Sequence, residues 1–336
     1  IMRIAVDAMG GDRGLEVTIK GSIDATDELG VNIILVGKSD LIEEELSKYN
    51  YDSSKVEIVD AKDIITNDDE PAMAIRKKKE SSMVIGLNLL KEKYVDAFIS
   101  AGNTGALLSG GTLIVKRIKG IERPALATVY PTKKGVSLLL DVGANADCKP
   151  RYLQQFAIMG SIYSKEVLNK SNPKVGLVNI GTERSKGNEL TKETYDLLEK
   201  TENINFYGNI EGRDLPEGEI DVLVCDGFVG NIILKLTEGL GLSIFSMLKE
   251  VFMKSFKSKL AALLLKPGLK KFKKKLDYTE YGGAPLLGVK GAVIKAHGSS
   301  DEVAIKNAIK QAKLFLENEV LEKIEEKITV LGGHNE

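Results

Sequence analysis

The chain has 336 residues, of which 43% are hydrophobic and 28% are charged, and its formal net charge is −1. These values are ordinary for a globular protein, and the length alone suggests about two domains. Its two cysteines, Cys148 and Cys225, are too few for a disulfide framework or a zinc cluster, so we expect reduced thiols. No run approaches the ~18 consecutive apolar residues of a membrane span, and no signal peptide pattern is seen, so a cytoplasmic protein is expected.

Short runs rich in β-branched residues alternate with longer segments of helical spacing. Strands are predicted at residues 3–7, 32–36, 55–59, 96–100, 125–130, 136–141, 174–180, 205–207, 221–225 and 291–296. Helices are predicted at residues 15–29, 40–48, 104–116, 151–168, 190–199, 231–249 and 301–327. This alternation is typical of a three-layer α/β/α fold with a mostly parallel sheet. We interpret residues 1–336 as one α/β unit, although two closely joined lobes would also fit.

Five apolar runs end in turns of glycine and small polar residues, at residues 9–12, 101–105, 143–145, 181–188 and 226–231. A parallel sheet gathers such turns along one edge, outside the carboxyl ends of its strands. Glycine lets backbone N–H groups approach a ligand, and helix N-termini carry partial positive charge. The turns therefore predict one site for an anionic ligand, with phosphate as the leading candidate.

A basic segment interrupts this pattern. Residues 249–276 contain ten lysines and a single acid, Glu250, and their apolar residues return at helical spacing. Pro267 and Gly268 are expected to break the helix, so residues 243–277 are predicted to form a basic amphipathic hairpin. Such a surface suits an anionic membrane or an acidic partner, whereas a solvated lysine face over a dimer or core contact is the plainer alternative. Nucleic acid is disfavoured, because the aromatic residues lie on the apolar stripe and not among the lysines.

The familiar catalytic motifs are missing from the sequence. No strand is followed by G-x-G-x-x-G, and neither a P-loop, a G-x-S-x-G elbow nor an H-E-x-x-H helix is found. We therefore predict no metal and no organic cofactor. The remaining chemistry that suits a phosphate site is transfer of an acyl group to phosphate, which needs positioning and stabilisation of an oxyanion.

Eight sequence blocks then carry a resemblance to a known family: residues 6–12, 70–76, 100–107, 120–125, 140–145, 179–183, 226–231 and 281–288. In order and spacing they resemble the bacterial phosphate acyltransferase of phospholipid synthesis. The resemblance implies that acyl-phosphate is made from acyl-acyl carrier protein and inorganic phosphate, for a glycerol-3-phosphate acyltransferase downstream. It also implies a fold similar to isocitrate/isopropylmalate dehydrogenases and phosphotransacetylases, a homodimer, and peripheral association with the cytoplasmic membrane.

Four residues are the predicted catalytic groups. Lys186 is expected to place a cation on the phosphate or the thioester oxygen, although it sits where an ordinary loop lysine would also occur. Asn231 would donate to the oxyanion, and Asp226 would orient a base or lysine unless it merely forms the turn. His297 ends a predicted strand, where a general acid–base role and a structural role are both open.

Further residues are predicted to bind substrate or membrane. Phosphate would be held by Gly10, Gly11, Asn103, Thr104, Gly105, Asn145, Gly181, Arg184, Gly187, Asn188, Gly227 and Gly230, some of which would also serve as helix caps. The membrane would be met by Phe256, Lys257, Lys259, Leu260, Leu263, Leu264, Lys270, Lys271 and Phe272. Three other functions stay open: phosphotransacetylase-like transfer from a small acyl-CoA, a decarboxylating dehydrogenase on the same fold, and a non-catalytic membrane scaffold.

Overall fold

The computed structural model describes residues 1–276 and 282–333, so residue 277 of the predicted hairpin and Tyr281 of the last sequence block lie outside it. Eleven described strands form one sheet in the order β3-β2-β1-β4-β11-β10-β5-β6-β9-β7-β8. The strands are β1 (Arg3–Asp7), β2 (Asn32–Gly37), β3 (Val56–Asp60), β4 (Ala97–Ser100), β5 (Ala125–Thr132), β6 (Gly135–Leu140), β7 (Lys174–Asn179), β8 (Asn205–Glu211), β9 (Val222–Val224), β10 (Ala284–Leu287) and β11 (Ala292–Lys295).

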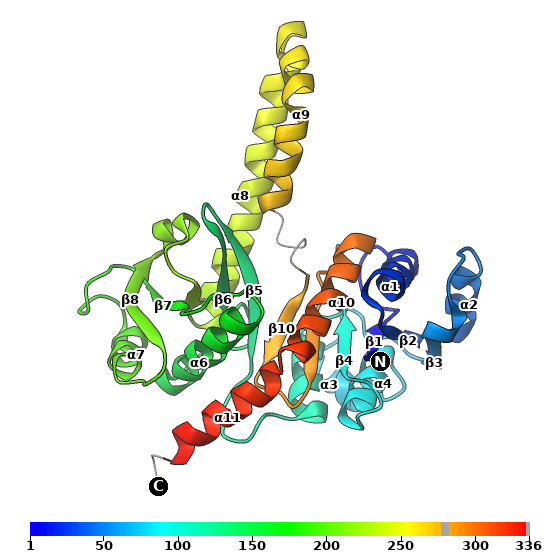
Figure 1. Cartoon of the computed structure of the whole chain (residues 1–336), viewed down its shortest axis with the longest axis horizontal. Coiled ribbons are helices and arrows are strands. Elements are labelled where there is room, and N and C mark those ends of the chain that lie inside the picture. The colour runs from blue at the N-terminus through cyan, green and yellow to red at the C-terminus, as the bar shows by residue number, and fades with distance from the viewer. Residues whose placement is uncertain (277–281, 334–336) are drawn as a thin grey trace.

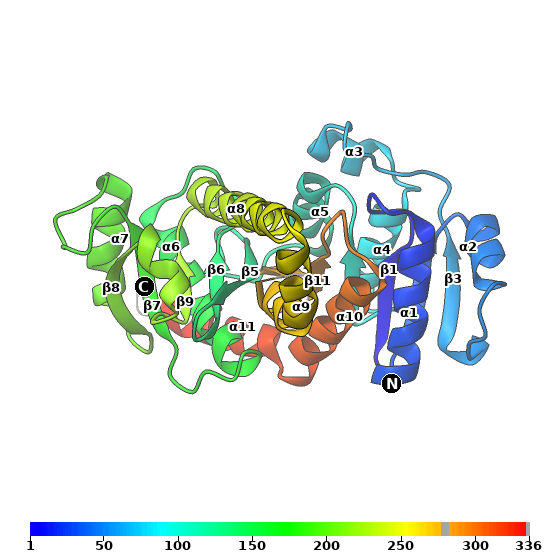
Figure 2. The same cartoon turned by 90° about the horizontal axis from the view of Figure 1, so that it is seen from above.

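Helices cover both faces of this sheet. They are α1 (Leu15–Leu29), α2 (Ser39–Leu46), α3 (Pro71–Lys77), α4 (Ser82–Lys91), α5 (Thr104–Gly110), α6 (Pro150–Glu166), α7 (Glu189–Glu199), α8 (Gly227–Met253), α9 (Phe256–Leu276), α10 (Glu302–Glu317) and α11 (Val320–Gly333). Figure 2 shows α8 on one side of the sheet and α10 and α11 on the other. The predicted three-layer α/β/α class is confirmed.

The core differs between the two faces because successive strand residues point to opposite sides. Ile4 and Val6 of β1 join a buried cluster that continues through α6 and β9, so one face carries a core that spans both halves of the sheet. On the opposite face the buried residues divide into two clusters, one under α3–α5 and one under α8. The two halves are therefore joined on one face and separated on the other.

Strand direction reverses in the middle of the sheet. β10 pairs antiparallel with both β11 and β5, and β5 pairs antiparallel with β6, whereas the other strand pairs are parallel. As a result β6, β7, β8 and β9 run opposite to β1, β4 and β11. The prediction that all five glycine turns share one edge is therefore wrong, since the turns after β6, β7 and β9 leave from the opposite edge to those after β1 and β4.

Helices α8 and α9 form an antiparallel pair that projects from the body (Figure 1), and the rings of Phe245 and Phe272 lie 5.7 Å apart between them. The turn lies at residues 254–255, where Ser255 and Ser258 each accept the other's backbone N–H, at 3.1 and 3.0 Å. The predicted break at Pro267 is wrong, because α9 continues through it to Leu276. Proline removes one intrahelical hydrogen bond, and the freed carbonyl belongs to the exposed Leu263, where water can bind it.

Two further helix features differ from the sequence expectation. Among the described helices α8 alone is long and apolar enough to cross a membrane, with a mean hydropathy of 1.4 over its most apolar 18 residues. The predicted C-terminal helix 301–327 is two helices, since Asn318 ends α10 and Glu319 adopts a φ of 51° before α11 starts. Asp301 caps α10 as expected, because its carboxylate accepts the N–H of Ala304 at 2.9 Å.

Candidate functional site

A cavity of about 270 Å³ opens where the two clusters of the divided face meet. One wall comes from the end of β11 and from the segments that follow β1, β4 and β11, and contributes Asp12, Thr104, Lys295 and His297. The opposite wall is the start of α8, which contributes Asn231, Lys235 and Glu238. Three predicted site residues, Thr104, Asn231 and His297, thus lie around one space.

Lys295 supplies a buried cation to this cavity. Its side chain is 9% exposed and donates to the carbonyl oxygens of Ala101, at 3.2 Å, and Ala296. Burial lowers the pKa of Lys295 to about 8, although the nearby carboxylates of Asp12 and Asp7 oppose that shift. A buried ammonium whose two described hydrogen-bond partners are neutral carbonyl oxygens is suited to an incoming anion, which would restore the solvation that the cation has lost.

Asp7, the last residue of β1, holds the ends of β1 and β4 together next to the cavity. Its buried carboxyl accepts from Ser100 Oγ at 2.7 Å and from the backbone N–H of Met9 at 3.1 Å, and burial raises its pKa. Gly10 lets the turn after β1 lie against the turn after β4, because a Cβ there would be 2.6 Å from the nitrogen of Gly102. Gly11, at a φ of 97°, packs on Ala101 in the same way. These glycines join two loops of the cavity wall.

His297 lies two residues after Lys295, just beyond the end of β11. Its Nδ1 accepts the backbone N–H of Ser299 at 3.2 Å and lies 2.8 Å from Ser299 Oγ, so the neutral ring carries its proton on Nε2. Burial lowers the pKa of His297, Lys235 and Lys295 act in the same direction, and Glu238 opposes them. A histidine that is neutral near pH 7 can exchange a proton with a bound substrate.

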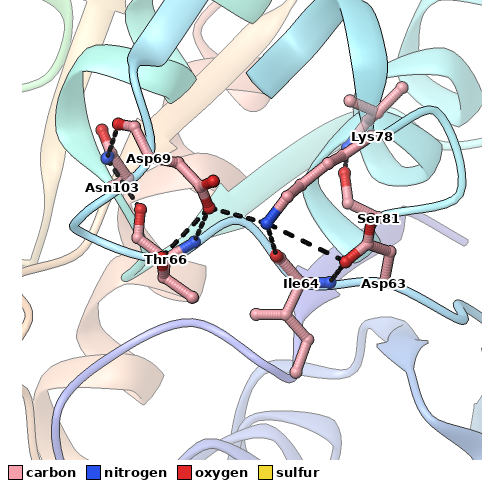
Figure 3. A network of polar contacts seen from close by, with 8 residues as sticks. Asp63, Ile64, Thr66, Asp69, Lys78, Ser81 and Asn103 are labelled. Atoms are coloured by element: carbon pink, nitrogen blue, oxygen red, sulfur yellow. Dashed lines mark hydrogen bonds and ion pairs between the residues drawn. The ribbon is translucent and has the colours of Figure 1, made fainter. Parts of the chain in front are cut away.

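A polar network holds the loop before α3, and Figure 3 shows its side chains. Asp69 accepts from the backbone N–H of Thr66 at 2.7 Å and from Lys78 Nζ at 2.8 Å, and Lys78 also donates to the carbonyl oxygen of Ile64 at 2.8 Å. Asn103 caps α5 through the N–H of Ala106 and donates to the carbonyl oxygen of Thr66 at 3.0 Å. The network thereby fixes the loop whose Asn67 lines the cavity.

Two of the residues predicted to bind phosphate in the turn after β4, Asn103 and Gly105, instead hold this turn against neighbouring segments. Asn103 is buried and uses both ends of its amide in the network just described. Gly105 allows α3 to lie close to α5, because a Cβ there would be 2.7 Å from Pro71 Cγ. Thr104 is exposed and lines the cavity, so it is the residue of this turn that can meet a ligand.

The start of α8 packs against the turn after β6. Asp141 accepts from the backbone N–H groups of Leu126, Ala144 and Asn145 at 3.0, 3.0 and 2.7 Å, and from the Asn145 amide at 2.9 Å. Gly227 donates to the carbonyl oxygen of Asn145 at 2.7 Å, and a Cβ on Gly230 would lie 1.8 Å from that of Asp141.

Asp226 caps this helix start through the N–H of Val229 at 2.8 Å. Of these junction residues, Asn145, Asp226, Gly227 and Gly230 are outside the cavity lining, whereas Asn231, one residue further along α8, is part of it.

The loop after β7 lies apart from the cavity lining. Lys186 is exposed, and its carbonyl oxygen accepts from the Asn179 amide at 3.2 Å. Arg184 pairs with Asp196 at 2.6 Å and with Glu199 at 3.0 Å. The other predicted residues here shape the loop: Gly181 is buried, Gly187 has a φ of 98°, and Asn188 caps α7 through the N–H of Thr191. A role for this loop in catalysis stays a prediction.

The sequence analysis did not single out several polar residues of the cavity, among them Lys235, Lys295, Glu238 and Asn67. Lys295 had a recognisable signal, because it is the one charged residue in the apolar run 291–296 and precedes His297 by two positions, on the same side of the strand. Lys235, Glu238 and Asn67 had none, since charged residues on a helix and an asparagine in a polar loop are ordinary surface residues. Within residues 1–276 and 282–333 no group of three or more His, Cys, Asp or Glu side chains forms a possible metal site.

Comparison with known proteins identifies the family. A family model described as "Fatty acid synthesis protein" matches residues 2–323. A phosphate acyltransferase of Alkaliphilus oremlandii is 61% identical over 98% of both chains, and one of Caldicellulosiruptor saccharolyticus is 56% identical over 98% of both. Among solved structures, a phosphotransacetylase from Streptococcus pyogenes has a TM-score of 0.65 at 16% identity over 94% of each chain, which confirms the predicted fold likeness. The chain therefore belongs to the fatty acid synthesis protein family, among relatives named phosphate acyltransferase, and it is an acyltransferase.

Proposed function

We propose that the enzyme transfers a fatty acyl group from acyl carrier protein to inorganic phosphate in this cavity, and that the acyl-phosphate feeds phospholipid synthesis. The observation that carries the proposal is the buried ammonium of Lys295, which lines the cavity together with His297 and Asn231. Phosphate is an anion, and the reaction develops a second negative charge on the thioester oxygen. A cation and fixed donors at one place meet both requirements.

The chemistry needs few groups beyond these. An oxygen of hydrogen phosphate attacks the thioester carbon, the C–O bond forms as the C–S bond breaks, and the thiolate leaves. The proton of the hydrogen phosphate ends on the thiol sulfur, so the products are acyl-phosphate and free thiol. Lys295 would hold the phosphate, Asn231 would donate to the oxyanion, and His297 would relay the proton. Lys186 would serve as a second cation if its loop moves toward the substrate.

The acyl donor is tested with purified protein. Phosphate is supplied with either palmitoyl-acyl carrier protein or acetyl-CoA, and acyl-phosphate is trapped with hydroxylamine as the hydroxamate. We expect at least tenfold higher kcat/KM with the carrier-bound donor. Equal or better turnover of acetyl-CoA would favour the phosphotransacetylase-like alternative, which the structural likeness to a phosphotransacetylase supports. Absence of acyl-phosphate with either donor would overturn the proposal.

We also propose that the protein is cytoplasmic, forms a homodimer, and binds the anionic face of the membrane through α8 and α9. Apolar side chains of the pair are exposed, with Phe256 at 83% and Leu264 at 76%. Ten lysines and one acid between residues 249 and 276 add favourable charge, worth about 1 kcal/mol for each lysine that reaches the surface. The pair would lie on the membrane and not span it, because the first turns of α8 line the cavity.

Vesicle sedimentation tests this docking. We expect binding to vesicles that contain phosphatidylglycerol and loss of binding in Leu260→Glu, with acyl-phosphate formation in solution retained. Leu41→Glu is the matched control, because Leu41 on α2 is 45% exposed and Leu260 is 52% exposed. Equal sedimentation of both variants with vesicles would contradict the membrane role, and pull-down of acyl carrier protein that only Leu260→Glu loses would indicate an acidic protein partner instead.

A further inference from the structure

The two carboxylate oxygens of Glu238 have different surroundings. Its Oε2 pairs with Lys235 Nζ at 3.1 Å. Its Oε1 is buried and has no hydrogen-bond partner among the residues that the structure describes, although Glu238 lines the cavity. A buried acceptor without a donor is destabilising by about 1–3 kcal/mol, more when it is charged, so a donor from a ligand is expected at this position.

The surroundings define that ligand. Two ammonium groups, Lys235 and Lys295, and two carboxylates, Glu238 and Asp12, line the same cavity, so the site suits an anion that also carries a hydrogen-bond donor. A carboxylate repels an anion that has no proton, because two acceptors then face each other. It attracts an anion that carries an O–H, since that group donates a charge-assisted hydrogen bond. Hydrogen phosphate carries such an O–H near neutral pH, and sulfate does not.

We propose that Glu238 is a specificity-determining residue whose Oε1 accepts the P–O–H of hydrogen phosphate, so that the cavity admits phosphate and rejects sulfate. This inference rests on the proposed function, since it requires phosphate to bind beside Lys295. It gives the unpartnered Oε1 of Glu238 a donor. It also orients the phosphate, because the oxygen that bears the proton faces α8 and the other oxygens are left for Lys295 and for attack on the acyl carbon.

The decisive measurement is the ratio of the sulfate inhibition constant to the phosphate KM. We expect a high ratio in the wild type and at least a tenfold lower ratio in Glu238→Gln, because the neutral amide can donate to sulfate. Two effects lower the ratio together: the KM for phosphate rises as the acceptor is lost, and sulfate becomes a competitive inhibitor. Circular dichroism and thermal unfolding establish that the variant is folded.

Two further variants separate selectivity from packing. Glu238→Asp keeps the carboxylate and is expected to retain sulfate rejection, whereas Lys235→Met removes the ion pair but leaves Glu238 and is expected to weaken both anions alike. If Glu238→Gln turns over too slowly, calorimetric titration with phosphate and with sulfate replaces the kinetic ratio. A ratio within twofold of the wild type in Glu238→Gln overturns the inference. An inactive wild type would instead overturn the proposed function.

Discussion

Replacement of Lys295 by methionine should separate function from stability. The ammonium donates to two carbonyl oxygens and is 9% exposed, and burial lowers its pKa from 10.5 to about 8. Each tenfold change in proton affinity corresponds to about 1.4 kcal/mol, so holding this group charged in the folded state destabilises the protein by up to about 3 kcal/mol. Methionine has a similar shape and no charge, and it removes that penalty together with the cation.

The sign of the pH effect follows from the direction of the shift. Because the pKa is lower in the folded state, the unfolded chain binds more protons between pH 8 and 10.5, and the contribution of Lys295 to stability rises across that window. The difference in unfolding free energy between wild type and Lys295→Met should therefore move by up to about 3 kcal/mol in favour of the wild type over this range. Below pH 7 that difference should be constant.

Urea denaturation at half-unit pH intervals measures this difference. Subtracting the unfolding free energy of the variant from that of the wild type cancels the contribution of groups that titrate in both proteins. The same variant should lose at least 100-fold in kcat/KM for phosphate, as expected when a fixed charge on the reacting group is removed. Wild-type kcat/KM should fall as the pH rises through about 8. A flat stability difference from pH 6 to 10.5 would refute the assigned burial of a charge, and unchanged phosphate kinetics would refute the assigned role.

Three other substitutions test the remaining geometry. Gly230→Ala should lower the unfolding free energy by about 3 kcal/mol or more in urea denaturation, since its Cβ would lie 1.8 Å from a backbone oxygen, whereas Gly239→Ala, with open space around it, should be neutral or stabilising. Lys78→Met should raise the phosphate KM about threefold to tenfold by loosening the loop that Asp69 holds, and the exposed Lys79→Met should not; equal KM values would count against the network. Lys186→Ala should lower kcat in the hydroxamate assay if its loop reaches the substrate, and full activity would remove Lys186 from the site.

The regular elements were predictable where burial dictates the pattern. The predicted strands at 3–7 and 32–36 agree with β1 and β2 because apolar, β-branched runs are what a sheet covered on both faces requires. Helices α3 and α4 were missed. The start of α3 did carry a signal, since Pro71 follows Glu70, whose side chain caps the helix through Ala72 and Met73. Most of α4 is buried, so it lacks a polar face for helical periodicity to reveal.

The site was harder to predict because it depends on strand direction. β10 has four residues, includes Pro285, and reverses the sheet by pairing antiparallel with β11 and β5. Without that strand the sequence suggests one continuous parallel sheet, and the turns of both halves fall on one edge. The short connection between β5 and β6 was the available sign of reversal, because a link of two residues permits only an antiparallel pair.

The reversal in the sheet also decides what kind of electrostatic field the cavity has. In a doubly wound sheet several peptide dipoles converge on a ligand, and their strength does not change with pH. Here the N-terminal end of α8 is turned to Asn145, and the cations of the cavity are the ammonium groups of Lys235 and Lys295. Because this field comes from titratable side chains, raising the pH through about 8 removes the positive charge of Lys295 while the backbone stays in place.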